Sequence, residues 1–185
     1  ASLLLLATLL LTDRRPLGFV VAVLAQLLVV VSVWFWVDLN EELADLPPLD
    51  WHFIGRLQAN KVRPVLRSFS TIHSLDSLAL AERLARIAAE EQCAPQVLLQ
   101  VKLRPDPSKG GFEPQELRQA WPRLQQLEPL RITGLMTMAP LGLEPEQRRI
   151  LFQDCAALAG ELGLRELSMG MSGDWPEAAA AGSTW

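Results

Sequence analysis

The chain has 185 residues, which is enough for one domain with a hydrophobic core, and half of its residues are hydrophobic. Its net charge of −4 and the scattered placement of its 17 basic residues argue against a nucleic-acid partner. The two cysteines, Cys93 and Cys155, lack metal-ligand spacing and are predicted to be buried free thiols. We therefore expect a cytoplasmic protein without a bound metal, because free thiols persist in a reducing compartment.

The hydrophobic excess is concentrated in the first 37 residues. Residues 17–37 carry no charge and end near Trp34 and Trp36, so they are a candidate membrane-spanning helix. Two alternatives remain open, which are a buried helix or strand pair and a frame-shifted start that is not native to the domain. The chain begins at Ala1 without Met, and we expect an incomplete or processed start. The predicted division is a hydrophobic segment at 1–38 and a domain at 39–185.

Strands and helices alternate along the rest of the chain. A helix end is predicted at 41–46, and five strands are predicted at 49–54, 69–73, 96–103, 131–138 and 167–171. Helices are predicted at 57–66, 78–92, 114–127, 145–162 and 176–181, with Pro64 expected to divide the first of them. This alternation indicates an α/β fold with a parallel sheet. Periodicity does not separate an open sheet from a closed barrel.

One stretch, LSMGMSGD at residues 167–174, is an apolar run that breaks into a Ser/Gly turn before an Ala-rich helix. Small residues let the backbone approach a ligand closely, and the unpaired amides that begin a helix favour an anion. The stretch therefore predicts a phosphate-binding turn. An ordinary strand-to-helix turn is the alternative, because Gly and Ser dominate turns in general.

Three further stretches accompany it, WHFIGRLQANK at 51–61, IHSLDS at 72–77 and GLMTMAP at 134–140. In this order and at these distances, the four stretches resemble the pyridoxal phosphate homeostasis family, which is similar to the N-terminal barrel domain of alanine racemase. The resemblance covers about residues 41–185. It implies a (β/α)8 TIM-barrel-like fold that is incomplete at both ends, since the first and last strands of the barrel are not recognisable.

The resemblance also implies a site for pyridoxal 5′-phosphate at the carboxyl ends of the strands. The residues expected on its phosphate side and walls are Ser172, Met171, Ser168, Gly173, Met136 and His52. For the histidines His52 and His73 the alternative is a hydrogen-bonded core position, and for Met136 and Met138 it is core packing.

The covalent part of the expected site is missing. The family holds the cofactor as an imine to a lysine in a region that does not match here, and none of the three lysines, Lys61, Lys102 and Lys109, takes its place. Lys61 is expected to be a solvated helix residue. We therefore predict that the chain binds the cofactor weakly or not at all.

The function implied by the resemblance is that of a non-catalytic protein that binds pyridoxal 5′-phosphate and takes part in its homeostasis. Two alternatives are a racemase-like enzyme dependent on the same cofactor and a membrane-tethered binding module. The first would need a lysine imine and an acid–base residue, and the second would need residues 17–37 as its anchor. The sequence leaves the oligomeric state open.

Overall fold

The computed structural model describes residues 50–106 and 109–185. Its strands are β1 (His52–Phe53), β2 (Thr71–Leu75), β3 (Gln96–Gln100), β4 (Arg131–Thr137) and β5 (Glu166–Met169). Its helices are the 3-10 turn η1 (Ala59–Lys61), α3 (Val62–Ser68), α4 (Leu78–Glu90), α5 (Pro114–Leu124), α6 (Pro145–Glu161) and α7 (Trp175–Ala180). The candidate membrane span at 17–37, the predicted helix end at 41–46 and the boundary between residues 38 and 39 lie outside the described residues.

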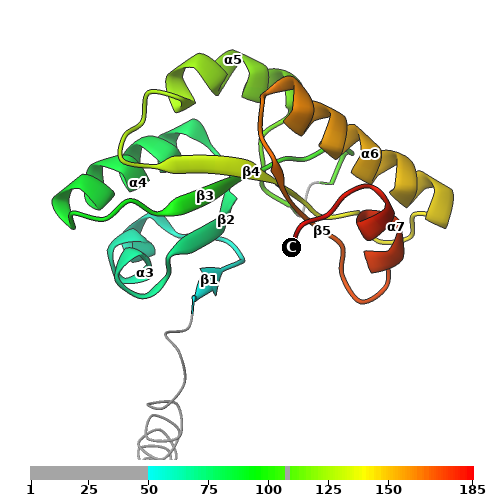
Figure 1. Ribbon diagram of the computed structural model, residues 1–185, viewed down its shortest axis with the longest axis horizontal. Helices are drawn as coiled ribbons and strands as arrows, with labels where there is room; N and C mark the ends of the chain where they lie inside the picture. Colours follow the sequence, from blue (N-terminus) through cyan, green and yellow to red (C-terminus); the bar gives the residue numbers. More distant parts are fainter. Residues whose placement is uncertain (1–49, 107–108) are drawn as a thin grey trace, which may run out of the picture. The chain divides into compact units, whose positions relative to one another are not determined.

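The strands form one parallel sheet in the order β1-β2-β3-β4-β5, so each strand pairs with the next along the chain. Helix α4 contacts α3 and α5, α6 contacts α7, and both α6 and α7 contact β5, while an ion pair between Arg118 and Glu161 joins α5 to α6. In Figure 1, helices α4, α5 and α6 follow one another along one side of the curved sheet. This is the arrangement that repeated right-handed βα units produce when a parallel sheet curls toward a barrel.

The two faces of the sheet differ in chemistry. On the face that packs against the helices, each strand contributes apolar residues to the main core, among them Ile72, Val97, Leu99, Leu135 and Leu167. The alternate residues point to the other, concave face, because successive side chains of a strand point in opposite directions. The buried residues on this face are Thr71, His73, Leu98, Gln100, Met136 and Ser168. Four buried polar side chains of the sheet, those of Thr71, His73, Gln100 and Ser168, are therefore gathered on the concave face.

The helix starts follow local signals that the sequence carries. Ser77 accepts a hydrogen bond from the Leu80 amide and caps α4. Helices α5 and α6 each begin with a capping box and a proline in the first turn, built on Glu113 and Glu144. These signals explain why the starts of α4, α5 and α6 agree with the predicted ones.

The strands differ from their predicted bounds, since β3 ends at Gln100 rather than at 103 and β5 lies at Glu166–Met169 rather than at 167–171, and the first two strands differ most. The strand expected at 49–54 is reduced to His52–Phe53, and the strand expected at 69–73 lies at Thr71–Leu75. The strand at Thr71–Leu75 begins late because α3 continues to Ser68. His73 is therefore in the middle of a strand rather than at its end. The predicted first helix is divided, but the division falls between Lys61 and Val62, and Pro64 lies in the first turn of α3.

Glycine is required where β4 and β5 meet. Gly134 pairs with Glu166, and a Cβ added to Gly134 would lie 2.1 Å from the Glu166 carbonyl oxygen. We expect Gly134→Ala to lower the free energy of unfolding by about 1–3 kcal/mol, because the strands would have to separate. Gly160 is the matched control, since it lies on the exposed side of α6 with nothing within 4 Å of its added Cβ.

Gly160→Ala is expected to raise the free energy of unfolding by about 0.5–1 kcal/mol, because alanine loses less backbone entropy in a helix. Urea unfolding of the two variants measures both changes. Equal effects of the two substitutions would contradict the close approach of β4 and β5.

Candidate functional site

A cavity of about 390 Å³ lies at the carboxyl ends of the strands. Every strand or the loop after it contributes to the lining, which consists of Ile54, Gly55, Arg56, Asp76, Gln100, Lys109, Gly110, Met136, Thr137, Met138, Ser168, Met169, Gly170 and Met171. In parallel α/β folds this is the edge at which ligands bind, because the loops that follow the strands converge there. The lining combines apolar walls with a few polar groups, as small-molecule sites do.

The loop after β3 is held against the cavity by two side-chain hydrogen bonds. Gln100 donates from Nε2 to the Gly110 carbonyl oxygen at 2.8 Å. Lys109 donates from Nζ to the Ala139 carbonyl oxygen at 2.9 Å, which links this loop to the one after β4. The backbone at Gly110 also passes close to Asp76, because an added Cβ there would lie 2.9 Å from the Asp76 carboxylate. These contacts bring a cation and an anion to one side of the cavity.

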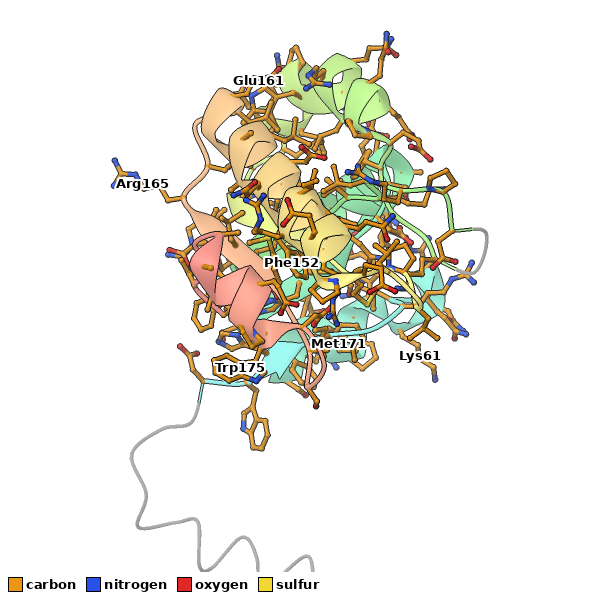
Figure 2. The ribbon with its side chains drawn as sticks, turned by 90° about the vertical axis from the view of Figure 1, so that its right-hand side faces the viewer. Lys61, Phe152, Glu161, Arg165, Met171 and Trp175 are labelled. Atoms are coloured by element: carbon orange, nitrogen blue, oxygen red, sulfur yellow. The ribbon has the colours of Figure 1, made fainter. Side chains whose placement is uncertain are left out.

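The turn after β5 forms the opposite side. Gly170 has φ +94°, and its added Cβ would lie 2.8 Å from Ala178 of α7, so a glycine is needed where the turn passes over the helix. The Asp174 carboxylate accepts a hydrogen bond from the Met171 amide and closes the turn. Figure 2 shows Met171 and Trp175 at the same end of the domain, away from Arg165, which precedes β5.

Arg148 of α6 fixes the turn from outside. It donates from Nη1 to the Gly173 carbonyl oxygen at 2.6 Å, and its Nη2 lies 3.1 Å from the Glu177 carboxylate. Its Nε is buried without a partner among the described residues. The guanidinium thus joins the turn after β5 to α6 and α7.

We expect Arg148→Met to lower the free energy of unfolding by about 1.5–3 kcal/mol, the usual contribution of hydrogen bonds to a charged group. Hydrogen exchange at the amides of residues 171–175 should become faster, because the turn loses its support. Arg149→Met is the control, since Arg149 pairs with Glu146 on the exposed surface of the same helix. Unchanged exchange in Arg148→Met would show that the turn does not depend on this side chain.

A chain of hydrogen bonds lies on the concave face, behind the cavity. His52 Nδ1 is 2.9 Å from His73 Nε2, and His73 Nδ1 is 2.9 Å from Ser168 Oγ. The Trp185 ring packs against both imidazoles, with centroid distances of 4.6 Å to His52 and 5.8 Å to His73. These hydrogen bonds join β1, β2 and β5 across the curve of the sheet and end at the Ser168 hydroxyl, which lines the cavity.

Burial, and then the neighbouring His52, lowers the pKa of His73 below its ordinary value of 6.5. The unfolded chain therefore binds a proton at this residue more readily than the folded chain does. Stability that depends on neutral His73 is present above about pH 6.5 and is lost as the pH falls below that value.

We expect the free energy of unfolding to fall between about pH 7.5 and 5.5, above the range in which carboxylates titrate. His73→Gln should be less stable at every pH, because it breaks the hydrogen-bond chain, and its stability should change less with pH. Urea unfolding at several pH values measures how steeply the free energy of unfolding changes with pH in the wild type and in His73→Gln. Equal slopes for the two proteins would contradict a lowered pKa of His73 in the folded state.

The structure places the residues of the predicted site at different depths. Ser168, Met136 and Met171 line the cavity, as does Met138. Ser172 and Gly173 lie in the exposed turn that follows Met171. His52 lies behind the cavity and is connected to the cavity through His73 and Ser168. The roles of these residues toward a ligand stay predictions.

Sequence reasoning missed most of the lining residues, among them the polar Asp76, Gln100 and Lys109. Asp76 and Lys109 follow predicted strands, so their positions at the carboxyl edge were a usable signal, whereas Gln100 was predicted to lie inside a strand that in fact ends there. The other two lysines do not line this cavity, because Lys61 is exposed in η1 and Lys102 pairs with Glu113 at 3.0 Å. The expectation of a solvated Lys61 is confirmed.

Other kinds of site find no support in the described part of the chain. Residues 50–106 and 109–185 contain no group of three metal-ligating side chains and no helix long and apolar enough to cross a bilayer. Cys155 is buried, and burial raises the pKa of its thiol to about 12, whereas Cys93 is only partly buried. A thiol with a raised pKa is a poor nucleophile.

Several known proteins are similar to this chain. A pyridoxal phosphate homeostasis protein from Synechocystis is 51% identical over 150 residues, which cover 78% of this chain and 69% of that protein. A protein of the same name from Deinococcus radiodurans is 44% identical over 147 residues, which cover 80% of this chain and 68% of that protein. The family described as a protein of unknown function (DUF3177) matches residues 1–103.

Solved structures are similar as well. PipY from Synechococcus elongatus without pyridoxal phosphate has a TM-score of 0.75 at 50% identity, covering 80% of this chain and 73% of PipY. PipY with pyridoxal phosphate bound has a TM-score of 0.74 at 49% identity, covering 80% of this chain and 72% of PipY. An alanine racemase from Clostridium difficile, at 15% identity and a TM-score of 0.56 over 70% of this chain and 35% of its own, shares the fold alone.

The fold and the position of the cavity define an α/β protein whose curled parallel sheet is of the alanine racemase barrel type, as the resemblance implied. The chain belongs to the pyridoxal phosphate homeostasis protein family, and its residues 1–103 also belong to the family of unknown function DUF3177.

Proposed function

We propose that this chain binds pyridoxal 5′-phosphate in the cavity at the carboxyl ends of its strands and takes part in the homeostasis of that cofactor without catalysing a reaction. The observation that carries the proposal is the cavity itself, formed in a chain that is 49% identical to PipY, whose structure was solved with pyridoxal phosphate bound. A cytoplasmic location belongs to the proposal and rests on the two free thiols.

The residues present fit the phosphate and the ring. Ser168 offers a hydroxyl, and Gly170 keeps the backbone of the turn free of a side chain on the same side of the cavity. Met136 and Met171 supply apolar surface on which a flat ring can lie. The volume of about 390 Å³ lies within the range of small-molecule sites.

The residues for a covalent attachment fit less well. When bound, the cofactor supplies an electrophilic aldehyde that a lysine amine can attack. Lys109 is the one lysine on the cavity lining, and its Nζ is engaged with the Ala139 carbonyl oxygen and lies 3.7 Å from the Asp106 carboxylate. An amine held in this way is turned toward the loop, so we propose weak, non-covalent binding.

The proposed absence of catalysis has a similar basis. Two titratable groups on the lining make structural contacts, since Asp76 accepts a hydrogen bond from Ser77 and Lys109 holds the loop after β3. No observation favours the racemase-like alternative or the membrane-tethered one. The match to DUF3177 runs from residue 1 through β1, β2 and β3 and therefore does not separate the hydrophobic segment from the barrel. The division at residue 38 stays a proposal.

The test has a covalent and a non-covalent part. The purified full chain is incubated with pyridoxal 5′-phosphate, reduced with borohydride and analysed by intact mass spectrometry and peptide mapping. We expect no stoichiometric adduct, and equilibrium dialysis should detect weak binding that Ser168→Ala lowers about tenfold, as the loss of a hydrogen bond to a charged group does.

Two controls make this test decisive. Ser70→Ala should leave binding unchanged, because Ser70 precedes β2 at the opposite edge of the sheet. Lys109→Met separates a specific adduct from scattered modification. A stoichiometric adduct on Lys109 would overturn the proposal of a lost covalent site, and binding equal in Ser168→Ala and Ser70→Ala would overturn the placement of the phosphate.

A further inference from the structure

The Ser168 hydroxyl can form hydrogen bonds in two directions, toward the cavity and toward His73. On one side it lines the cavity, and on the other its Oγ lies 2.9 Å from His73 Nδ1. A hydroxyl has one proton to donate, so a hydroxyl that donates to His73 presents only its lone pairs to the cavity. The state of His73 therefore decides what Ser168 offers to a ligand.

The state of His73 is in turn tied to that of His52. Each neutral imidazole carries one N–H, and the contact between His52 Nδ1 and His73 Nε2 at 2.9 Å needs one donor and one acceptor. In one arrangement His52 donates to His73, His73 donates to Ser168, and the Ser168 proton is available to the cavity. In the other arrangement Ser168 donates to His73, and His73 donates to His52. The two arrangements differ only in the direction in which the hydrogen bonds between His52, His73 and Ser168 point.

We propose that His52 and His73 are positioning residues that set the direction of the Ser168 hydroxyl, so that an anionic group in the cavity selects the arrangement in which His52 donates. This inference rests on the proposed function, because it takes the phosphate of the ligand as that anion. It assigns a specificity role to His52, which has no contact with the cavity of its own. A ligand that offers a hydrogen-bond donor at Ser168 is disfavoured in this arrangement.

The surroundings make the coupling effective. His73 is 4% exposed and Ser168 is 8% exposed, so water cannot readily replace a missing partner in the chain. The Trp185 ring packs against both imidazoles and is held by a hydrogen bond from its Nε1 to the Glu166 carboxylate at 2.9 Å. The lowered pKa of His73 favours its neutral ring, and a neutral ring carries one N–H, whose position sets the direction of the hydrogen bonds.

The direct test reads the protonated nitrogen of each histidine. The chain has two histidines, so ¹⁵N labelling gives a simple spectrum in which protonated and unprotonated ring nitrogens are distinguished. The full chain at about pH 8, where neutral imidazole dominates, is titrated with pyridoxine 5′-phosphate, which has no aldehyde. We expect His73 to carry its proton on Nδ1 and His52 on Nδ1 in the bound state.

A second measurement uses affinity in a double-mutant cycle. His52→Phe keeps a ring against Trp185 and removes the donor, and it should weaken binding of pyridoxine 5′-phosphate about tenfold, the effect of one hydrogen bond to a charged group. In the Ser168→Ala background the same substitution should have no further effect. Pyridoxine, which lacks the phosphate, should bind the wild type and His52→Phe equally.

The outcomes separate the two proposals. Two results would overturn the proposed role of His52 and His73 and leave the proposed function standing. One is binding by the wild type with the His73 proton on Nε2, and the other is an equal effect of His52→Phe with and without Ser168. If the wild type does not bind pyridoxine 5′-phosphate, both the proposed function and the proposed role of the two histidines are overturned. The spectrum of the wild type needs no variant, so a His52→Phe protein that fails to fold does not prevent the test.

Discussion

The curvature of the parallel sheet is the constraint on which the site depends. In the sheet order β1-β2-β3-β4-β5, His73 of β2 and Ser168 of β5 are three strands apart, yet their side chains are 2.9 Å apart. A flat sheet would separate them by three strand spacings, or about 14 Å. The hydrogen bond forms because twist and curl carry β5 back toward the first strands, and the same curl closes the cavity.

Strand periodicity divides the molecule into a stabilising side and a chemical side. Most of the residues that face the helices are apolar and form the main core, whereas those on the concave face include two histidines, a glutamine and a serine. Buried polar groups are costly unless they are paired. Here they are paired with one another or with loop carbonyls, and the pairs lead to the cavity edge. The polar contacts that stabilise the concave face thus also shape the site.

The similarity to PipY and the distribution of lysines point to a site with unequal halves. The half that we propose for the phosphate consists of Ser168, Gly170 and the turn supported by Arg148. On the other side of the cavity the one lysine present, Lys109, serves to join two loops. On the proposed function, such a site would hold an anion and a ring by shape and hydrogen bonds, without the added affinity of a covalent attachment.

The sequence by itself determined the family and the alternation of strands and helices. These features depend on motifs and near neighbours, as the cap at Ser77 does, whereas Val97, Leu98 and Leu99 are all apolar and do not show which face of β3 joins the main core. The four motifs also identified Ser168, Met136 and Met171, which are brought to one cavity although more than thirty residues separate Met136 from Met171.

Only the tertiary structure decided which residues meet. It put His52 behind the cavity rather than on its wall, moved His73 into the middle of a strand and brought Lys109 to the lining. It also revealed that Arg148 supports the turn after β5, a contact for which the sequence carries no signal. These outcomes depend on how far the sheet curls and where loops cross, and those quantities are set by packing between distant segments.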